Sequence, residues 1–87
     1  MSTSGSNPAM MQTARAVRAW VDGGKVWIEL DDGREIGFPA SKYRRLRDAD
    51  EEQLSRVRIE ARGRALRWGE LDEDLSIDGL LAGRWLP

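Results

Sequence analysis

The feature that most constrains this chain is an alternation of apolar and polar residues with a period of two, interrupted twice by Asp and Gly. A period of two is typical of strands that bury one face. The interruptions, Asp22-Gly23-Gly24 and Asp31-Asp32-Gly33, supply the positive φ values of tight turns. Residues 14–21, 25–30 and 34–38 therefore predict a three-stranded antiparallel meander, which Pro39 ends.

The same alternation predicts which side of the meander is buried. The side chains that we expect to face the core are Val17, Ala19, Val21, Val26, Ile28, Leu30, Ile36 and Phe38. Arg18, Trp20 and Trp27 fall on the opposite side. The aromatic pair, Trp20 and Trp27, is therefore exposed on the outer side of the sheet, unless the final helix and Trp85 cover that side and make a core on both faces.

After Pro39 the period changes to about three. Ala40, Tyr43 and Leu46 predict a short helical segment, and Asp50 with Gln53 resembles a capping box that starts another turn and delivers Leu54 to the core. Alternation then returns in residues 57–61 and 65–68, which predict a hairpin connected through Gly63. The side chains that we expect to face inward from it are Val57, Ile59, Ala61, Leu66 and Trp68.

The last patterned segment combines acids with a helix signal. Ser76 is a typical N-cap for a helix that begins at Ile77, Leu80 and Leu81 give that helix an apolar side, and Gly83 suits a left-handed C-cap. Five acids precede it or lie in its first turn: Glu70, Asp72, Glu73, Asp74 and Asp78. We interpret residues 72–78 as the approach to the helix and its first turn, where negative charge is favourable by ~0.3–1 kcal/mol each.

Two chemical alternatives for these acids are weaker. Asp72, Asp74, Ser76 and Asp78 alternate like the first ligands of a calcium-binding EF-hand, but Ile77 stands where that loop needs glycine and Gly83 where it needs glutamate. Paired carboxylates also serve hydrolases, yet a chain of 87 residues rarely encloses a substrate cleft. We therefore expect no metal, no cofactor and no catalytic residue.

Composition excludes further classes. The chain has no cysteine and no histidine, so disulfides, thiolate metal sites and His-dependent catalysis are excluded. Fourteen basic and fifteen acidic residues nearly cancel, which gives no overall field toward nucleic acid or membrane. Because the chain has no cysteine and no apolar run long enough to span a membrane, we expect a cytoplasmic protein. We expect a disordered tail at residues 1–12 and a single α+β domain at 13–87.

Local patches are the remaining candidates for function. An exposed tryptophan pair beside arginines suits a protein interface. Residues 42–67 hold nine Lys or Arg against five acids, so Arg44, Arg45 and Arg47, with arginines of the predicted hairpin, form a basic stripe if the two elements lie side by side. The candidate partner-binding residues are Trp20, Trp27, Arg44, Arg45, Arg47, Glu70 and Asp72.

The segment GFPASKYRRLRDADEEQLSRVRIEARGRALRWGELDEDLSIDGLLAGR resembles a small prokaryotic family, domain of unknown function 2442. The most specific part is Trp68, residues 70–76, the triplet Gly-Leu-Leu at 79–81 and Gly83; Gly69 departs from the family, where proline is frequent. The resemblance implies an α+β domain that stands alone or precedes a helix-turn-helix. It also implies a gene often beside that of another small protein, as in toxin–antitoxin pairs, and brings no catalytic residues.

These observations favour a non-enzymatic protein-binding module, such as the antitoxin-like or regulatory member of a two-gene system; homo-oligomers are also compatible with them. One alternative is an accessory nucleic-acid-binding or transcription-regulatory module that uses the basic stripe. Another is an inhibitor encoded by a phage or mobile element, which meets a host protein through its acidic segment.

Overall fold

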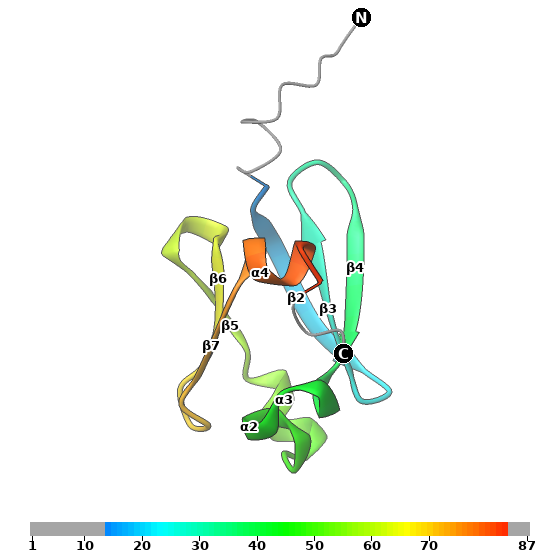
Figure 1. Ribbon diagram of the computed structural model, residues 1–87, viewed down its shortest axis with the longest axis vertical. Helices are drawn as coiled ribbons and strands as arrows, with labels where there is room; N and C mark the ends of the chain where they lie inside the picture. The colour runs from blue at the N-terminus through cyan, green and yellow to red at the C-terminus, as the bar shows by residue number, and fades with distance from the viewer. Residues whose placement is uncertain (1–13, 84–87) are drawn as a thin grey trace, which may run out of the picture.

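The computed structural model describes residues 14–83, which form two three-stranded antiparallel sheets and several short helices (Figure 1). The predicted α+β class is confirmed. The predicted tail at residues 1–12 lies outside the described residues.

The first sheet is the predicted meander. Its strands are β2 (Ala16–Asp22), β3 (Lys25–Leu30) and β4 (Glu35–Pro39), in the order β2-β3-β4. The β2–β3 turn places Gly23 and Gly24 at φ values of 61° and 78°, which glycine adopts without the steric cost of a Cβ atom. Adjacent strands in the chain are therefore adjacent in the sheet, as the short turns require.

One part of the predicted burial is wrong, because β2 contains a bulge. Ala16 pairs with Leu30 and Arg18 pairs with Glu29, so Val17 is an extra residue in the ladder. The bulge turns Ala16 inward and leaves Val17 57% exposed, whereas Ala19 and Val21 pack against the core as expected. A strict period of two cannot reveal such an insertion.

Helical turns connect the two sheets. They are η1 (Ala40–Lys42), α2 (Arg44–Arg47) and α3 (Glu51–Ser55). The predicted capping box is present: Gln53 N–H donates to the Asp50 carboxylate at 2.8 Å and Asp50 N–H donates to the Gln53 side chain at 3.0 Å. Leu46 and Leu54 are buried, so these turns fasten onto the core.

The second sheet contains the predicted hairpin and one strand more. Its strands are β5 (Arg58–Glu60), β6 (Ala65–Trp68) and β7 (Glu73–Ser76), in the order β5-β6-β7. Ile59 shares the inward side of the sheet with its cross-strand partner Leu66, as expected, but it is 37% exposed. The expectation that Ala61 faces the core is wrong, because Ala61 is exposed in the turn η2 (Ala61–Gly63). The strand ends at Glu60 because Ala61 and Arg62 take positive φ values of 55° and 57°.

The C-terminal helix α4 (Ile77–Leu81) has the predicted ends. The Ser76 hydroxyl accepts a hydrogen bond from Gly79 N–H at 3.0 Å, and Gly83 has a φ of 73°. Ile77 and Leu80 are buried, so the apolar side of the helix joins the core.

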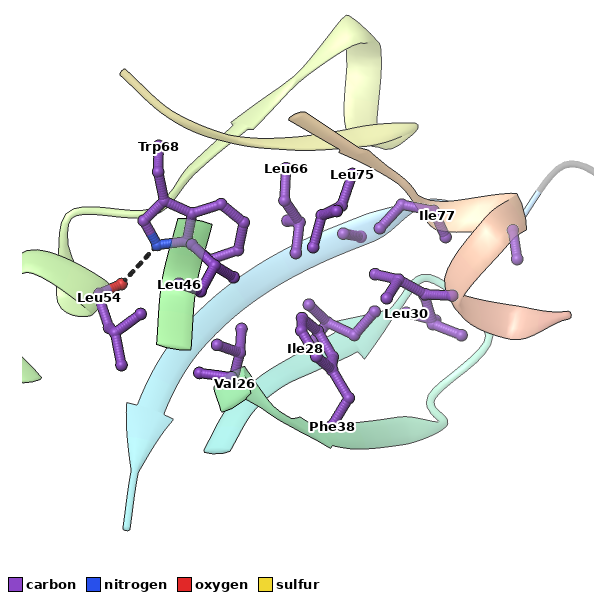
Figure 2. Close-up of a cluster of buried hydrophobic side chains, with 14 residues drawn as sticks. Val26, Ile28, Leu30, Phe38, Leu46, Leu54, Leu66, Trp68, Leu75 and Ile77 are labelled. Atoms are coloured by element: carbon purple, nitrogen blue, oxygen red, sulfur yellow. Dashed lines mark hydrogen bonds between the residues drawn. The ribbon is translucent and has the colours of Figure 1, made fainter. Parts of the chain in front are cut away.

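The core lies between the two sheets. Figure 2 shows Val26, Ile28 and Leu30 from one sheet facing Leu66 and Leu75 from the other. The Trp68 side chain is 1% exposed, and its indole Nε1–H donates to the Leu54 carbonyl at 2.9 Å. This hydrogen bond ties β6 to α3, and the inward residues leave an outer face on each sheet.

Candidate functional site

The outer face of the β2-β3-β4 sheet carries the predicted tryptophan pair. The register aligns its side chains in three rows across the strands. The rows are Arg18–Glu29–Glu35, Trp20–Trp27–Gly37 and Asp22–Lys25–Pro39. We call these nine positions the tryptophan face. An aromatic row thus lies between two rows that carry charge.

Trp27 lies against glycine on the neighbouring strand. A Cβ atom built on Gly37 would come within 2.6 Å of two carbon atoms of the Trp27 ring, so the ring occupies the space that another residue would fill. Aromatic side chains stabilise strand glycines in this way. Gly37 thus lets the Trp27 ring lie close to the sheet.

Cations accompany both rings. The Arg18 guanidinium lies 4.1 Å from the centroid of Trp20, and the Lys25 ammonium lies 6.0 Å from that of Trp27. Both tryptophans remain half-buried, partly open to solvent. The buried side chains of helix α4 belong to the core, and Trp85 lies outside the described residues.

The acidic segment is organised differently from the prediction. Glu73–Ser76 is a strand that pairs with β6, and within the described helix α4 only Asp78 lies in the first turn. The interpretation of residues 72–78 as a helix approach is therefore wrong for Glu73 and Asp74. Acids occupy most positions from 70 to 74, so the alternation of apolar and polar residues that marks a strand was not recognised there. In the structure the alternation is present, with Leu75 buried and Asp74 exposed.

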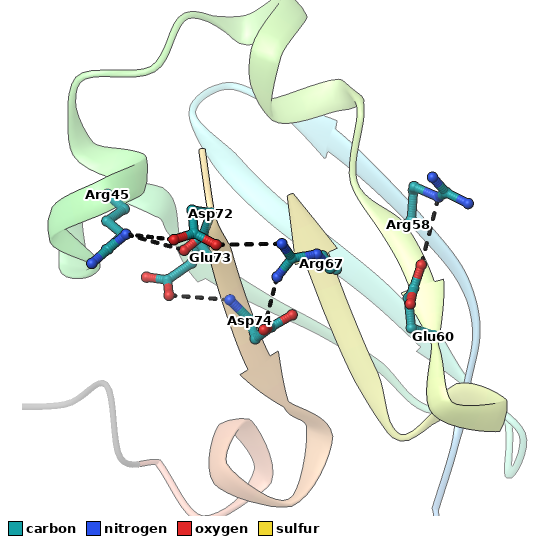
Figure 3. A network of polar contacts seen from close by, with 7 residues as sticks. All are labelled: Arg45, Arg58, Glu60, Arg67, Asp72, Glu73 and Asp74. Atoms are coloured by element: carbon teal, nitrogen blue, oxygen red, sulfur yellow. Dashed lines mark hydrogen bonds and ion pairs between the residues drawn. The ribbon is translucent and has the colours of Figure 1, made fainter. Parts of the chain in front are cut away.

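Arginines pair with these acids on the outer face of the second sheet (Figure 3). Arg67 Nη1 donates to Asp74 at 2.8 Å and Arg67 Nη2 to Asp72 at 3.3 Å. Arg45 Nη1, from α2, donates to the Asp72 carboxylate at 3.4 Å and to its carbonyl at 3.2 Å. The bond to Asp74, followed by that to Asp72, raises the pKa of Arg67.

Glu70 belongs to a second set of pairs at the same end. Arg56 Nη1 donates to Glu70 at 2.9 Å and Arg56 Nη2 to Glu52 at 3.1 Å. The Glu70 carboxylate is the main cause that raises the pKa of Arg56. Together with Arg45–Asp72, these contacts hold the β6–β7 turn against the helical connection. Asp72 itself has a φ of 54° in that turn.

The basic stripe is divided. Arg45 and Arg67 do meet, but at Asp72, which compensates their charge. Arg62 lies in the β5–β6 turn, at the other end of the sheet from α2 (Figure 1). Arg44 and Arg47 are exposed and form no ion pair within residues 14–83.

The seven predicted partner-binding residues thus fall into separate regions. Trp20 and Trp27 lie together on the tryptophan face, whereas Arg45, Glu70 and Asp72 lie together around the β6–β7 turn. The first region belongs to the β2-β3-β4 sheet and the second to the other sheet and the helical connection, and the core lies between the sheets (Figure 2). Gly37, which the sequence interpretation did not single out, is part of the tryptophan face; its place opposite Trp27 needed the strand register.

Other site types are not indicated. Across residues 14–83, no group of three or more candidate ligands is arranged to hold a metal ion. No helix of the described chain has the length and hydropathy needed to cross a membrane.

Comparison with known proteins places the chain in a family. Residues 16–84 match the family model described as "Protein of unknown function (DUF2442)". The chain belongs to this family. The comparison with curated proteins gives no match.

Two solved structures resemble this DUF2442 domain. A crystal structure of a protein of unknown function from Rhodospirillum rubrum is similar with a TM-score of 0.76 and 38% identity, over 80% of this chain and 87% of that one. A solution NMR structure of an uncharacterized protein from Chromobacterium violaceum is similar with a TM-score of 0.75 and 26% identity, over 91% of this chain and 76% of that one. Both support the fold.

Proposed function

We propose that this DUF2442 domain is a non-enzymatic protein-binding module that docks through the tryptophan face. The observation that carries the proposal is the in-register pair of Trp20 and Trp27, half-buried on the face of the sheet opposite the core. Tryptophan and arginine are the residues that most often dominate interface energetics. Arg18, stacked on Trp20, adds such a contact.

The acidic and basic side chains of the other sheet have a structural role in this proposal. Asp72, Asp74 and Glu70 each contact an arginine of the same chain, so binding a partner there would require breaking those pairs. On the tryptophan face Arg18 pairs with Glu29, but Asp22 and Lys25 form no ion pair within residues 14–83. This face is therefore the better-prepared surface.

We place the module in the cytoplasm of a prokaryote, as the antitoxin-like or regulatory member of a two-gene system. This finer assignment is supported by the resemblance drawn from the sequence and by the absence of cysteine, which suits a reducing compartment. In such a system the partner is the protein encoded beside the domain.

Copurification from the native cell tests the proposal. We expect the wild-type chain to retain the neighbouring gene product at constant stoichiometry, and the W20S/W27S variant to lose it. V17S, which removes an exposed apolar side chain outside the nine positions, should retain it. Recovery of monomer alone from wild type, or full retention by W20S/W27S, would contradict the proposal.

A further inference from the structure

The charges of the tryptophan face change sign across the aromatic row. On β2, Arg18 lies on one side of Trp20 and Asp22 on the other; on β3, Glu29 and Lys25 take the corresponding places beside Trp27 in the opposite order. On β4, Glu35 corresponds to the neutral Pro39. If a second copy of this face is rotated by 180° about the aromatic row, each charged side chain of β2 and β3 comes to lie opposite a side chain of the opposite charge. On β4 the rotation places Glu35 opposite Pro39, so no two like charges meet.

This charge pattern is self-complementary. In a two-fold interface, residue i of one copy meets residue j of the other, and j meets i. If two tryptophan faces pack with the axis along the aromatic row, Arg18 lies opposite the partner subunit's Asp22, and Lys25 opposite the partner subunit's Glu29. Each of these contacts occurs twice, and the aromatic rows lie against each other.

We propose that the tryptophan face binds the same face of a second copy of this chain in this two-fold arrangement. The inference rests on the proposed docking role of that face and names a second occupant for it, besides the neighbouring gene product. Strands of the two copies then run nearly aligned, as in packed sheets about 10 Å apart.

The side chains have hydrogen-bonding capacity left for this contact. Arg18 uses only Nε toward Glu29, at 3.1 Å, and its side chain is 60% exposed. Asp22 and Lys25 form no ion pair within the described part of the chain, although they are cross-strand neighbours. Both are exposed. A second copy supplies the opposite charge to each.

The proposed interface involves few residues, so we expect the dimer to be weak. Nine positions per copy are well below the roughly 20–30 residues per side of a standard interface, so the dimer belongs to the weak, reversible class. Measurement must therefore reach protein concentrations of about 1 mM, where a dimer with a dissociation constant of that order is substantially populated.

A pair of charge reversals tests the arrangement by sedimentation equilibrium on the full chain. In K25E two carboxylates oppose each other across the axis, and in E29K two ammonium groups do. We expect each variant alone to dimerise more than about tenfold less than wild type. We expect their equimolar mixture to associate again, because every contact between unlike variants joins opposite charges. Thermal melting of each variant checks that it is folded.

The results separate this inference from the proposed function. A monomeric wild type at about 1 mM, variants that dimerise like wild type, or a mixture that stays monomeric would each overturn the two-fold arrangement. Copurification of a different protein that depends on Trp20 and Trp27 would then still support docking through this face. Wild-type dimerisation with rescue in the mixture supports the second copy.

Discussion

The outer faces of the two sheets both carry basic and acidic side chains, but these side chains are paired to different extents. On the β5-β6-β7 sheet, arginines and acids satisfy one another within the chain, as in the contacts of Arg67 with Asp72 and Asp74. On the β2-β3-β4 sheet, an aromatic row lies between charges of which Asp22 and Lys25 form no ion pair among residues 14–83. The paired charges of the β5-β6-β7 sheet hold a turn, whereas the tryptophan face keeps charges that are unpaired within the described chain beside its one internal pair, Arg18–Glu29.

The largest effect should come from comparing an inward with an outward tryptophan. Trp68→Ala should lower the free energy of unfolding by about 3–5 kcal/mol, because it opens the core and leaves the Leu54 carbonyl without its donor. Trp20→Ala removes a half-buried ring and should cost about 1–2 kcal/mol. Urea unfolding measures both, and equal costs would refute the distinction.

Glycines on the two sheets give a sharper comparison. Gly37→Ala should cost about 1–3 kcal/mol and weaken association, because the new Cβ displaces the Trp27 ring. Gly69→Ala, in the β6–β7 turn, meets no atom within 4 Å and should change stability by less than about 0.5 kcal/mol. Indole fluorescence and urea unfolding check both. An unchanged Trp27 environment in the Gly37 variant would contradict the packing described.

The acidic side chains should contribute little individually. Glu70→Gln and Asp72→Asn should each lower stability by less than about 1 kcal/mol, since their ion pairs are exposed. Asparagine tolerates the positive φ of residue 72, and Arg45 keeps its bond to the carbonyl there. Copurification should be unaffected. Loss of a partner with unchanged melting temperature would instead favour an acidic docking site.

The smallest expected effect is a change in stability at alkaline pH, caused by ionisation of the Tyr43 side chain. Burial, followed by the charge of Glu73, raises the pKa of its hydroxyl above the usual 10.0. A pKa raised by folding gives stability that is present below pH 10 and is lost as pH rises through the folded value. Wild type should therefore lose more stability than Tyr43→Phe in that alkaline range. Absorbance titration at the tyrosinate band should place the folded pKa above 10.0; a lower value would contradict the burial of the Tyr43 hydroxyl.

The sequence predicted the meander, the capping box, the hairpin and both ends of α4, because each follows from local period or turn chemistry. It did not predict the bulge at Val17 or the strand β7. Those depend on pairing with distant partners: Leu30 and Glu29 for the bulge, and β6 for the acidic segment. Periodicity within one segment carries no information about such pairing.

The features of the candidate site likewise divide into those that local pattern predicted and those that depend on pairing between distant segments. Alternation placed Trp20 and Trp27 on the outer side, and the structure agrees. The register that aligns them with Gly37, and that reverses the charges around them, became visible only once the strands were paired. Likewise, no local pattern could show that Arg45 and Arg67 share Asp72.

Site-specific photocrosslinking in the native cell tests the central claim most directly. A photoreactive amino acid replaces Glu35, at the edge of the tryptophan face, or Arg58, exposed on the other sheet. We expect discrete protein adducts, to a second copy or to another protein, from position 35 and none from position 58. Adducts from position 58 alone would show that docking occurs on the opposite side of the molecule.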